Sequence, residues 1–556
     1  MSMKRRLARV INQSLQQAQA TGSLNLTERP TVQIEVPKIT EHGDFATNVA
    51  MILASQIRRP PRQVAEIIIQ HLDAPAGMLD RLEIAGPGFI NFFIQESYWY
   101  QVLKDIQTEG EAYGQSDRGR GLRVQVEFVS ANPTGPLHIG HGRGAAVGDA
   151  LANILAACGY QVEREYYIND LGTQMRTLGL SLYLRLRQLQ GQEVDFPDTC
   201  YQGDYVIDLA RQYQANHGPL AAGEPSEADL QALGAYAGAA ILAEIRQDLD
   251  DFGVHFDHWF SEAQLFQNGS LERALAFLQD QGYLYETEGA LWFKATAWGD
   301  EKDRVVRRRN GATTYFASDV AYHWNKIKRG YDQVVDIWGA DHHGYVPRLK
   351  AAVQALGTDA QFLKVILVQL VSLLRQGQPV AMTTRGGTFV TLREVIDEVG
   401  KDAARFIFLS RRSDAHLDFD LDLAKQQSAE NPVYYVQYAH ARLASVFRLA
   451  AEREIDLKGL GEANLNRLNL PEEIALIKLL ASYPDVVEAA AQALEPHRVT
   501  YFLTDLAAQF HSYYYKHRFI SESEELTQAR LFLVQGIKTV LAQGLQLLGV
   551  KAPKSM

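Results

Sequence analysis

The stretch Asn132-Pro-Thr-Gly-Pro-Leu-His-Ile-Gly-His-Gly-Arg-Gly144 decides the fold class of this chain, because it lies between a strand pattern and a helix pattern. Apolar residues alternate through residues 124–128 before it, and they recur at helical spacing from Ile139 to Ala157 after it. A second strand pattern, at residues 162–167, follows the helix. This order predicts a βαβ unit of a parallel sheet, with the quoted loop at the N-terminus of the helix.

The chemistry of this loop is that of a phosphate-binding helix start. His138 and His141 are one helical turn apart and share a face, so their ring N–H groups join the exposed backbone amides and the helix dipole. Gly140 leaves room for a nucleotide to approach the backbone. The loop has neither the Gly-x-Gly-x-x-Gly of dinucleotide sites nor the closing Gly-Lys-Ser/Thr of a P-loop. The alternative is a glycine-rich turn with two incidental histidines.

A second strand–helix–strand unit follows later, with strand patterns at residues 334–338 and 363–367 and a helix at about residues 345–356. Gly339-Ala-Asp-His-His-Gly344 joins its first strand to the helix. An Asp just past a parallel strand suits the hydroxyls of a ribose. A structural turn is the alternative, and a metal site is less favoured because adjacent histidines point apart and no zinc-ligand spacing is present.

Patterns along the 556 residues divide the chain into three domains. Residues 1–115 mix helical stretches with strand patterns at residues 32–36 and 86–94, which predicts a small α/β domain. Residues 120–412 hold both βαβ units, with a mostly helical insertion at about residues 170–300.

Helical periodicity dominates residues 413–556, which predicts an all-α bundle. Asn431-Pro432 is typical of a helix start. Pro484 is expected to separate a helix at residues 474–480 from one at residues 486–494, because proline breaks the helical hydrogen-bond ladder.

Composition excludes several classes of protein. The formal charge of −11 argues against a polycation that coats nucleic acid. Two cysteines cannot form a disulfide framework or a four-cysteine zinc site. The N-terminus lacks the apolar core of a signal peptide, and the longest apolar stretch, residues 365–374, is about half of a membrane span. A cytoplasmic protein is expected.

Two basic clusters stand out against this acidic average. Residues 304–309 contain four arginines, and residues 530–556 contain four basic side chains and no acidic one. Such clusters position phosphate backbones without reading a sequence. A solvated charged face is the alternative for each.

His138-Ile-Gly-His141 resembles the HIGH signature of class I aminoacyl-tRNA synthetases, and the longer string from Glu127 to His141 resembles arginyl-tRNA synthetases in particular. The resemblance implies an α/β fold: a Rossmann-like parallel-sheet catalytic domain, an N-terminal α/β additional domain that contacts tRNA, and a C-terminal all-α anticodon-binding bundle. Matching strings cover nearly the whole chain: residues 42–50, 86–91, 167–172, 315–323, 337–348, 434–442 and 548–556.

This resemblance implies that the chain attaches L-arginine to tRNA(Arg) through an arginyl-adenylate formed from ATP. The adenylate forms by in-line attack of a carboxylate on the α-phosphorus, which needs positioning and charge stabilisation more than a covalent nucleophile. Mg²⁺ would arrive with ATP, and no tightly bound metal site is expected in the protein. The implied partners are tRNA(Arg), ATP and L-arginine, with no membrane and no DNA, and a monomer is expected.

The resemblance also implies roles for individual residues. A guanidinium demands acceptors in a planar, forked arrangement, and Tyr315 and Asp319 match the family's side-chain pocket. Catalysis is expected from His138, His141 and Arg385. ATP contacts are expected from Pro133, Thr134, Gly135, His138, Gly140, His141, Gly339, Asp341, His342, Met382 and Thr383. Arginine contacts are expected from Glu127, Ser130, Asn132, His141, Tyr315, Asp319 and His343, and tRNA contacts from Asn91, Tyr434, Tyr438 and Arg442.

One departure from the family's pattern concerns its second signature, a Lys-Met-Ser-Lys-Ser-like loop. Here it reads Ala381-Met-Thr-Thr-Arg385, so both lysine positions are lost, at Ala381 and Thr384. Arg385 keeps a cation nearby, with Arg375 and Arg393 as less favoured helpers, and slower activation is expected rather than inactivity. The loss keeps open a second hypothesis, a tRNA-binding paralogue without catalysis. A third, a small-molecule nucleotidyltransferase, would not need the flanking domains.

Overall fold

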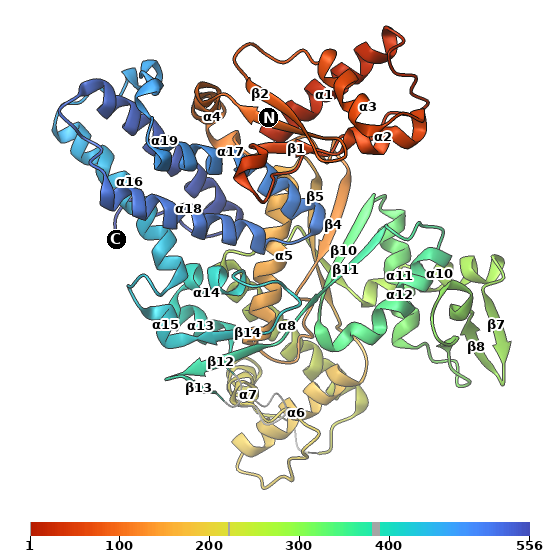
Figure 1. The fold of residues 1–556 in the computed structure, drawn as a ribbon. Coiled ribbons are helices and arrows are strands. Elements are labelled where there is room, and N and C mark those ends of the chain that lie inside the picture. The colour runs from red at the N-terminus through yellow and green to blue at the C-terminus, as the bar shows by residue number, and fades with distance from the viewer. Residues whose placement is uncertain (1, 221–222, 381–389) are drawn as a thin grey trace.

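A five-stranded parallel sheet forms the centre of the molecule in the computed structural model, which describes residues 2–220, 223–380 and 390–556. The strand order is β11-β10-β4-β5-β6, with β4 in the middle (Figure 1). The chain leaves β4 toward β5 on one side and later returns to β10 on the other, so a crevice opens between the C-terminal ends of β4 and β10. The strands are β4 (Arg123–Glu127), β5 (Gln161–Ile168), β6 (His258–Ser261), β10 (Gln333–Gly339) and β11 (Leu363–Val368).

The parallel sheet and its crossover helix confirm the βαβ prediction. Helix α5 (Ile139–Ala157) joins β4 to β5 and is buried along most of its length, which is typical of a helix apolar on all sides. Gly148 lets the helix close on the strand: a Cβ there would lie 2.2 Å from Cγ of Phe128.

The stretch between β5 and β10 is more than a helical insertion, because it also supplies strand β6 to the central sheet. That strand has four residues, too few for a clear alternating pattern. A separate antiparallel sheet, β7-β8-β9, follows it. The remaining elements of this stretch are α6 (Thr173–Leu189), α7 (Asp204–His217), α8 (Glu227–Phe252), α9 (Ala263–Gln267), α10 (Ser270–Asp280), β7 (Leu284–Thr287), β8 (Ala290–Phe293), η3 (Ala295–Trp298), β9 (Arg304–Arg307) and α11 (Tyr315–Lys328).

Short elements after β10 complete this part of the chain. The helix expected at residues 345–356 begins as a 3-10 turn, η4 (Ala340–Tyr345), and continues as α12 (Val346–Ala355). A small three-stranded sheet, β13-β12-β14, stands beside the central one. Its elements and neighbours are β12 (Val371–Arg375), β13 (Gln378–Pro379), α13 (Leu392–Val399), α14 (Lys401–Phe408), β14 (Leu417–Asp420) and α15 (Leu421–Lys425).

The N-terminal region is an α/β unit with a three-stranded antiparallel sheet, β1-β3-β2. The strand predicted at residues 32–36 is wrong: only Glu35 pairs there, in an isolated bridge with Ala46. Prolines at positions 30 and 37 flank this segment and have no N–H to extend a ladder. The elements are α1 (Met3–Ala20), η1 (Thr40–His42), β1 (Phe45–Thr47), α2 (Val49–Ile57), α3 (Pro61–Gln70), β2 (Leu79–Ala85), β3 (Phe89–Ile94), α4 (Glu96–Glu109) and η2 (Gly110–Ala112).

The C-terminal region is a helical bundle from α16 onward, and it packs against both α4 and α5 (Figure 1). The all-α prediction is wrong at its start, because residues 417–420 form strand β14 of the small sheet. Asn431 caps its first helix by accepting a hydrogen bond of 3.2 Å from the backbone N–H of Val433. The predicted break at Pro484 is wrong, because one helix runs through it. The elements are α16 (Pro432–Glu452), η5 (Gly459–Glu462), η6 (Leu465–Arg467), α17 (Pro471–Ala493), α18 (His497–Lys516) and α19 (Glu524–Leu547). Across the described ranges, none of the helices has the length and apolar character needed to cross a bilayer.

Candidate active site

A pocket of about 440 Å³ lies at the C-terminal ends of β4 and β10, where the topology predicts a ligand. It brings together six residues expected from the sequence: Glu127, Ser130, Tyr315, Asp319, Gly339 and His342. Five further lining residues had no role assigned from the sequence: Tyr167, Tyr322, His323 and Tyr345, which stand in strings that resemble the family, and Asp336, which stands in none.

The turn after β4 is strained, and it forms one wall of the pocket. Val129 and Ser130 have φ angles of 67° and 41°, in the left-handed region that a β-branched residue rarely occupies. The Ser130 hydroxyl donates to Oε1 of Glu127 (3.0 Å) and accepts from the backbone N–H of Tyr167 (3.1 Å). These bonds hold the turn in a conformation that the chain alone would not favour, a feature common at ligand sites.

The two histidines of the signature stand at the start of α5, with ring centroids 3.7 Å apart. Backbone amides donate to their Nδ1 atoms: Gly140 N to His138 (3.1 Å) and His138 N to His141 (3.2 Å). A neutral ring that accepts at Nδ1 carries its proton on Nε2. Burial lowers the pKa of both histidines, that of His141 to about 3, so both rings are neutral donors at neutral pH.

The loop before these histidines is braced by the helices that follow β5. The Tyr205 hydroxyl of α7 donates to the carbonyl oxygen of Thr134 (2.7 Å), and a Cβ at Gly135 would lie 3.2 Å from that hydroxyl. Asn132 donates from its amide to Oε1 of Gln174 on α6 (2.6 Å) and does not line the pocket. The loop thus keeps its shape through contacts that the sequence did not reveal.

Asp319 supplies a carboxylate to the pocket, and Glu262, which does not line it, is a close electrostatic neighbour. Asp319 is half-buried, accepts a hydrogen bond from the Tyr345 hydroxyl, and has its pKa raised by burial to about 6. Glu262 is buried nearby, and desolvation raises its pKa against the opposing effect of the Ser318 and Tyr167 hydroxyls. In the part of the chain that the structure describes, neither carboxylate forms an ion pair. This end of the pocket therefore suits a cationic ligand.

The loop after β10 reaches the pocket only in part. Gly339 and His342 line it, whereas Asp341 and His343 do not. The Asp341 side chain is 78% exposed and lies 3.5 Å from Nε2 of His342, and Nδ1 of His343 faces the carbonyl oxygen of Ala340 at 3.2 Å. This exposed loop can meet a nucleotide from the open side of the crevice.

The second signature falls on residues 381–389, so Ala381, Met382, Thr383, Thr384 and Arg385 lie outside the described residues. The residues directly after it, 390–392, are hydrogen-bonded to the first signature. Ile139 N donates to Val390 O (3.3 Å), and Leu392 N donates to Leu137 O (2.7 Å).

Two arginines tie α5 to other parts of the fold. Arg143, fully buried, donates to three carbonyl oxygens, those of Gln369, Arg412 and Ala415, each at 2.8 Å. It therefore joins the start of α5 to the segments on either side of the second signature.

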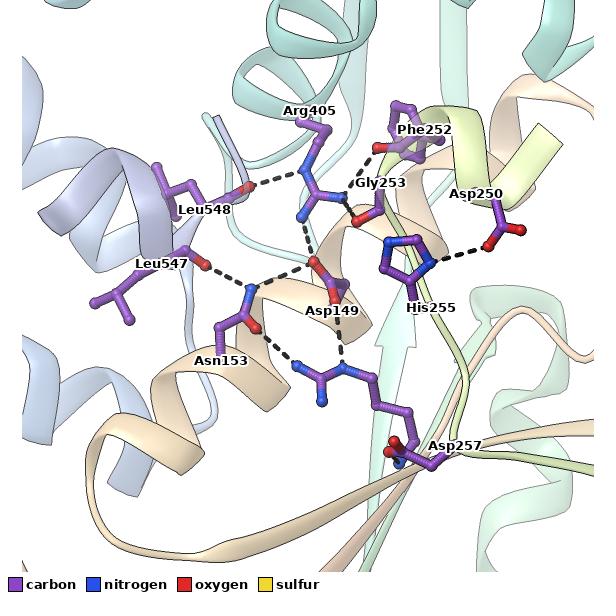
Figure 2. A network of polar contacts seen from close by, with 11 residues as sticks. Asp149, Asn153, Asp250, Phe252, Gly253, His255, Asp257, Arg405, Leu547 and Leu548 are labelled. Carbon is purple, nitrogen blue, oxygen red and sulfur yellow. Dashed lines mark hydrogen bonds and ion pairs between the residues drawn. The ribbon is translucent and has the colours of Figure 1, made fainter. Parts of the chain in front are cut away.

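The second arginine, Arg405 on α14, connects the middle of α5 with the C-terminal bundle (Figure 2). Its guanidinium lies 2.5 Å from Oδ2 of Asp149 and 2.9 Å from the carbonyl oxygen of Leu548. Asn153, one turn after Asp149, donates to the carbonyl oxygen of Leu547 (3.2 Å). The helix that begins with the signature histidines is thus anchored to the end of α19.

The residues expected to contact tRNA differ in how their side chains are arranged and buried. Tyr434 and Tyr438 stack on α16 with centroids 5.5 Å apart, and the Arg442 guanidinium lies 4.3 Å from the centroid of Tyr438. Asn91 is only 3% exposed within β3, which leaves its side chain little surface for a tRNA and does not support a direct contact.

Acidic side chains pair with three of the four arginines of the first basic cluster and with one of the four basic residues of the second. Arg304 pairs with Asp300 (2.7 Å), Arg307 with Glu272 (2.7 Å) and Arg309 with Glu288 (2.5 Å). Arg530 of the second cluster is buried against Glu473 at 2.9 Å. These contacts favour a structural role over a phosphate-binding patch for the first cluster and for Arg530. Within residues 2–220, 223–380 and 390–556, no group of three or more His, Cys, Asp or Glu side chains could hold a metal ion.

Comparisons with known proteins place the chain in a family. Family models match along the chain: "Arginyl tRNA synthetase N terminal domain" at residues 5–94, "tRNA synthetases class I (R), catalytic domain" at 103–214 and 236–444, and "DALR anticodon binding domain" at 436–556. The parallel sheet, the signature at its switch point and the catalytic-domain match define a class I aminoacyl-tRNA synthetase.

Curated relatives narrow this class. The chain is 56% identical to the arginine--tRNA ligase of Citrifermentans bemidjiense and 55% identical to that of Syntrophotalea carbinolica, covering 100% of both chains in each case. The arginyl-tRNA synthetase structure of Thermus thermophilus shares the fold, with a TM-score of 0.78, 23% identity and 100% of each chain covered. The chain belongs to the arginyl-tRNA synthetase family.

Proposed function

We propose that this chain attaches L-arginine to tRNA(Arg) through an arginyl-adenylate, consuming ATP and releasing AMP and diphosphate. The observation that carries the proposal is the Asp319 carboxylate, which lines the pocket, accepts from the Tyr345 hydroxyl and has the buried Glu262 as an electrostatic neighbour. Among the described residues, neither acid has an ion-pair partner. Family membership supports the same activity. The 56% identity to an arginine--tRNA ligase over its whole length weighs against a non-catalytic paralogue.

The Asp319 end of the pocket would select arginine by charge and by shape. A guanidinium offers five donors in a rigid plane, which match paired carboxylate and hydroxyl acceptors. The charge of the ligand would offset the cost of burying these two acids. A lysine would leave part of these acceptors unsatisfied, so discrimination on the order of 10⁴ is expected without an editing step.

The opposite end of the pocket would hold the amino-acid end of the ligand. Glu127, with the Ser130 hydroxyl bonded to it, offers a carboxylate to the substrate's ammonium group. The substrate's own carboxylate would then point toward the start of α5. Asn132, His141 and His343 remain candidates for contacts with it.

The start of α5 would bind the phosphates of ATP. His138 and His141 would donate from Nε2, together with the backbone amides of the helix start, and ATP would bring Mg²⁺. An oxygen of the arginine carboxylate attacks the α-phosphorus as the bond to the bridging oxygen of diphosphate breaks. Neutral donors aimed at these oxygens stabilise the charge as it shifts. A terminal ribose hydroxyl of the tRNA then attacks the carbonyl carbon, and AMP leaves.

The remaining proposals concern the nucleotide, the tRNA and the state of the protein. Pro133, Thr134, Gly135 and Gly140 would contact ATP on one side, with Asp341 and His342 on the other. Tyr434, Tyr438 and Arg442 would contact the tRNA through stacking and charge. We also propose a monomer that works in the cytoplasm.

The direct test is charging of purified tRNA with labelled L-arginine. The proposal predicts charging that depends on ATP and is absent with L-lysine. ATP–pyrophosphate exchange should be run with and without tRNA, because the resemblance implies that activation can require it. Retained tRNA binding without any charging would favour the paralogue instead.

A further inference from the structure

We propose that Lys326 is a positioning residue of the amino-acid site, which keeps the Glu127 carboxylate ionised and turned toward the substrate's ammonium group. The inference rests on the function proposed above, in which Glu127 accepts that ammonium. It deepens the proposal by naming the group that prepares Glu127 for binding.

The geometry begins with the pairing of two strands. Residues Glu127 of β4 and Asp336 of β10 stand opposite each other in the parallel register, and both line the pocket. Lys326 of α11 lies between them with its ammonium 2.5 Å from Oε2 of Glu127 and 2.8 Å from Oδ1 of Asp336. Its side chain is fully buried, which is rare for lysine and requires such partners.

The helix that carries Lys326 serves both ends of the proposed substrate. Asp319, His323 and Lys326 follow one another at helical spacing, so one face of α11 carries all three. Asp319 lies at the end of the pocket that is proposed to bind the guanidinium group. Nε2 of His323 lies 2.9 Å from Oδ2 of Asp336. Lys326 contacts Glu127, at the end of the pocket that is proposed to bind the ammonium group of the substrate. Helix α11 therefore sets the distance between the proposed guanidinium-binding and ammonium-binding ends of the pocket.

Electrostatics explains why a cation is needed at this position. Two buried carboxylates on adjacent strands repel each other, and one of them would take up a proton. Burial already raises the pKa of Glu127, and Lys326 opposes that rise. The pKa of Lys326 is itself raised, since Asp336 and Glu127 outweigh the effect of desolvation, so the ammonium stays charged. A protonated Glu127 could not pair with the ammonium group of the substrate.

Lys326 also fixes the direction of the carboxylate. Oε1 of Glu127 accepts from the Ser130 hydroxyl at 3.0 Å, while Oε2 accepts from Lys326. With both oxygens engaged, the side chain cannot rotate away from the pocket. An acceptor already in place loses less conformational entropy on binding, which raises affinity.

A purely structural ion pair is the competing explanation, and the same helix provides a matched control. Arg329, one turn after Lys326, lies 2.5 Å from the fully buried carboxylate of Glu165. Glu165 belongs to the same sheet but does not line the pocket. Loss of Arg329 removes a cation from a buried acid that does not line the pocket and that reaches it through the Tyr322 hydroxyl, which donates to Oε1 of Glu165 (2.5 Å).

The experiment compares two ligands by titration calorimetry on the full chain. L-arginine carries the ammonium group, whereas δ-guanidinovaleric acid keeps the guanidinium and the carboxylate but lacks it. The proposal predicts that Lys326→Met lowers the affinity for L-arginine about 10- to 100-fold and that for δ-guanidinovaleric acid less than about twofold. In steady-state charging, KM for arginine should rise with little change in KM for ATP. Arg329→Met should leave the preference between the two ligands unchanged.

A double-mutant cycle tests whether Lys326 acts through Glu127. In a Glu127→Gln background, Lys326→Met should have little further effect on arginine affinity. If Lys326→Met does not fold, Lys326→Met/Asp336→Asn, which removes one charge of each sign, is compared with Asp336→Asn alone. Equal losses for both ligands, or full additivity in the cycle, would overturn the proposal. Failure of the proposed function would instead appear in the unmodified chain, as absent charging or as no preference for arginine over its deaminated analogue.

Discussion

The hydroxyl of Tyr113 donates a hydrogen bond of 3.0 Å to the carbonyl oxygen of Leu480, the group that Pro484 leaves without its helical donor. A proline in a helix interior has no N–H for the carbonyl four residues earlier, and that missing bond is one reason why such helices break. Here Tyr113, which directly follows η2 near the end of the N-terminal region, supplies the donor, and α17 continues unbroken.

Replacing Tyr113 by Phe should therefore destabilise the protein by about 1–3 kcal/mol, because it leaves a buried carbonyl without a donor. The thermal midpoint measures the effect. In a Pro484→Ala background the backbone N–H of residue 484 can serve Leu480 itself, so the same change should cost much less. An equal cost in both backgrounds would show that Tyr113 acts only through packing.

This contact also shows what the sequence could and could not predict. The central strands and α5 were predicted because their apolar patterns are local, and the loop between them carries its own helix-start chemistry. Pro484 was interpreted as a break because its compensating donor lies far away in sequence, at Tyr113. Strand β6 was missed because four residues carry too little pattern.

The candidate site also contains some residues that the sequence reveals and others that it does not. His138 and His141 could be found because they form one contiguous motif, and Asp319 because it stands in a string that resembles the family. Glu262 and Lys326 could not, because they lie outside those strings and only the fold brings them beside Asp319 and Glu127. Single residues that meet only through topology leave no signal in the sequence of one chain.

The pH dependence of arginine binding should follow Asp319. Its pKa is about 6 because burial disfavours the charged form. Only the ionised carboxylate can pair with a guanidinium, so affinity should be constant above about pH 7 and should fall by up to about tenfold per pH unit below pH 6. By linkage, binding lowers the pKa of Asp319 and releases a proton as pH approaches 6.

Titration calorimetry with L-arginine across this pH range measures the effect. Asp319→Asn should bind weakly and lose the decline near pH 6. Glu262 and Glu127 also face this region, and their pKa values are raised by burial, so Glu262→Gln serves as a comparison. If the affinity of Asp319→Asn for L-arginine still declined below pH 6, another group would be responsible for the pH dependence.

Gly549 should be intolerant of a side chain because of Arg405. Its φ is +67°, and a Cβ would lie 2.2 Å from Nη2 of Arg405, which holds Asp149 on α5. Gly549→Ala combines left-handed strain of about 1–2 kcal/mol with disruption of a buried ion pair, which costs about 3–5 kcal/mol. We expect a large fall in the thermal midpoint and slower charging, because α5 carries the signature histidines.

A matched glycine separates these two costs. Gly22 has a φ of +73° and open space where a Cβ would stand, so Gly22→Ala should show the strain alone. Equal shifts of the thermal midpoint for the two variants would mean that Arg405 moves aside without cost.

Arg385 should supply the charge on the pyrophosphate side of ATP that the lost lysines of the second signature would otherwise provide. The two other arginines considered for this role are engaged elsewhere: Arg375 lies 2.8 Å from Glu398, and Arg393 lies 2.6 Å from Asp251. Arg385→Ala should lower the rate of ATP–pyrophosphate exchange about 10- to 1000-fold, as expected when a donor to a developing charge is removed. KM for arginine should change little. Arg375→Ala, which removes a surface ion pair, should remain close to the unmodified chain, and an exchange rate for Arg385→Ala that matches it would exclude the role.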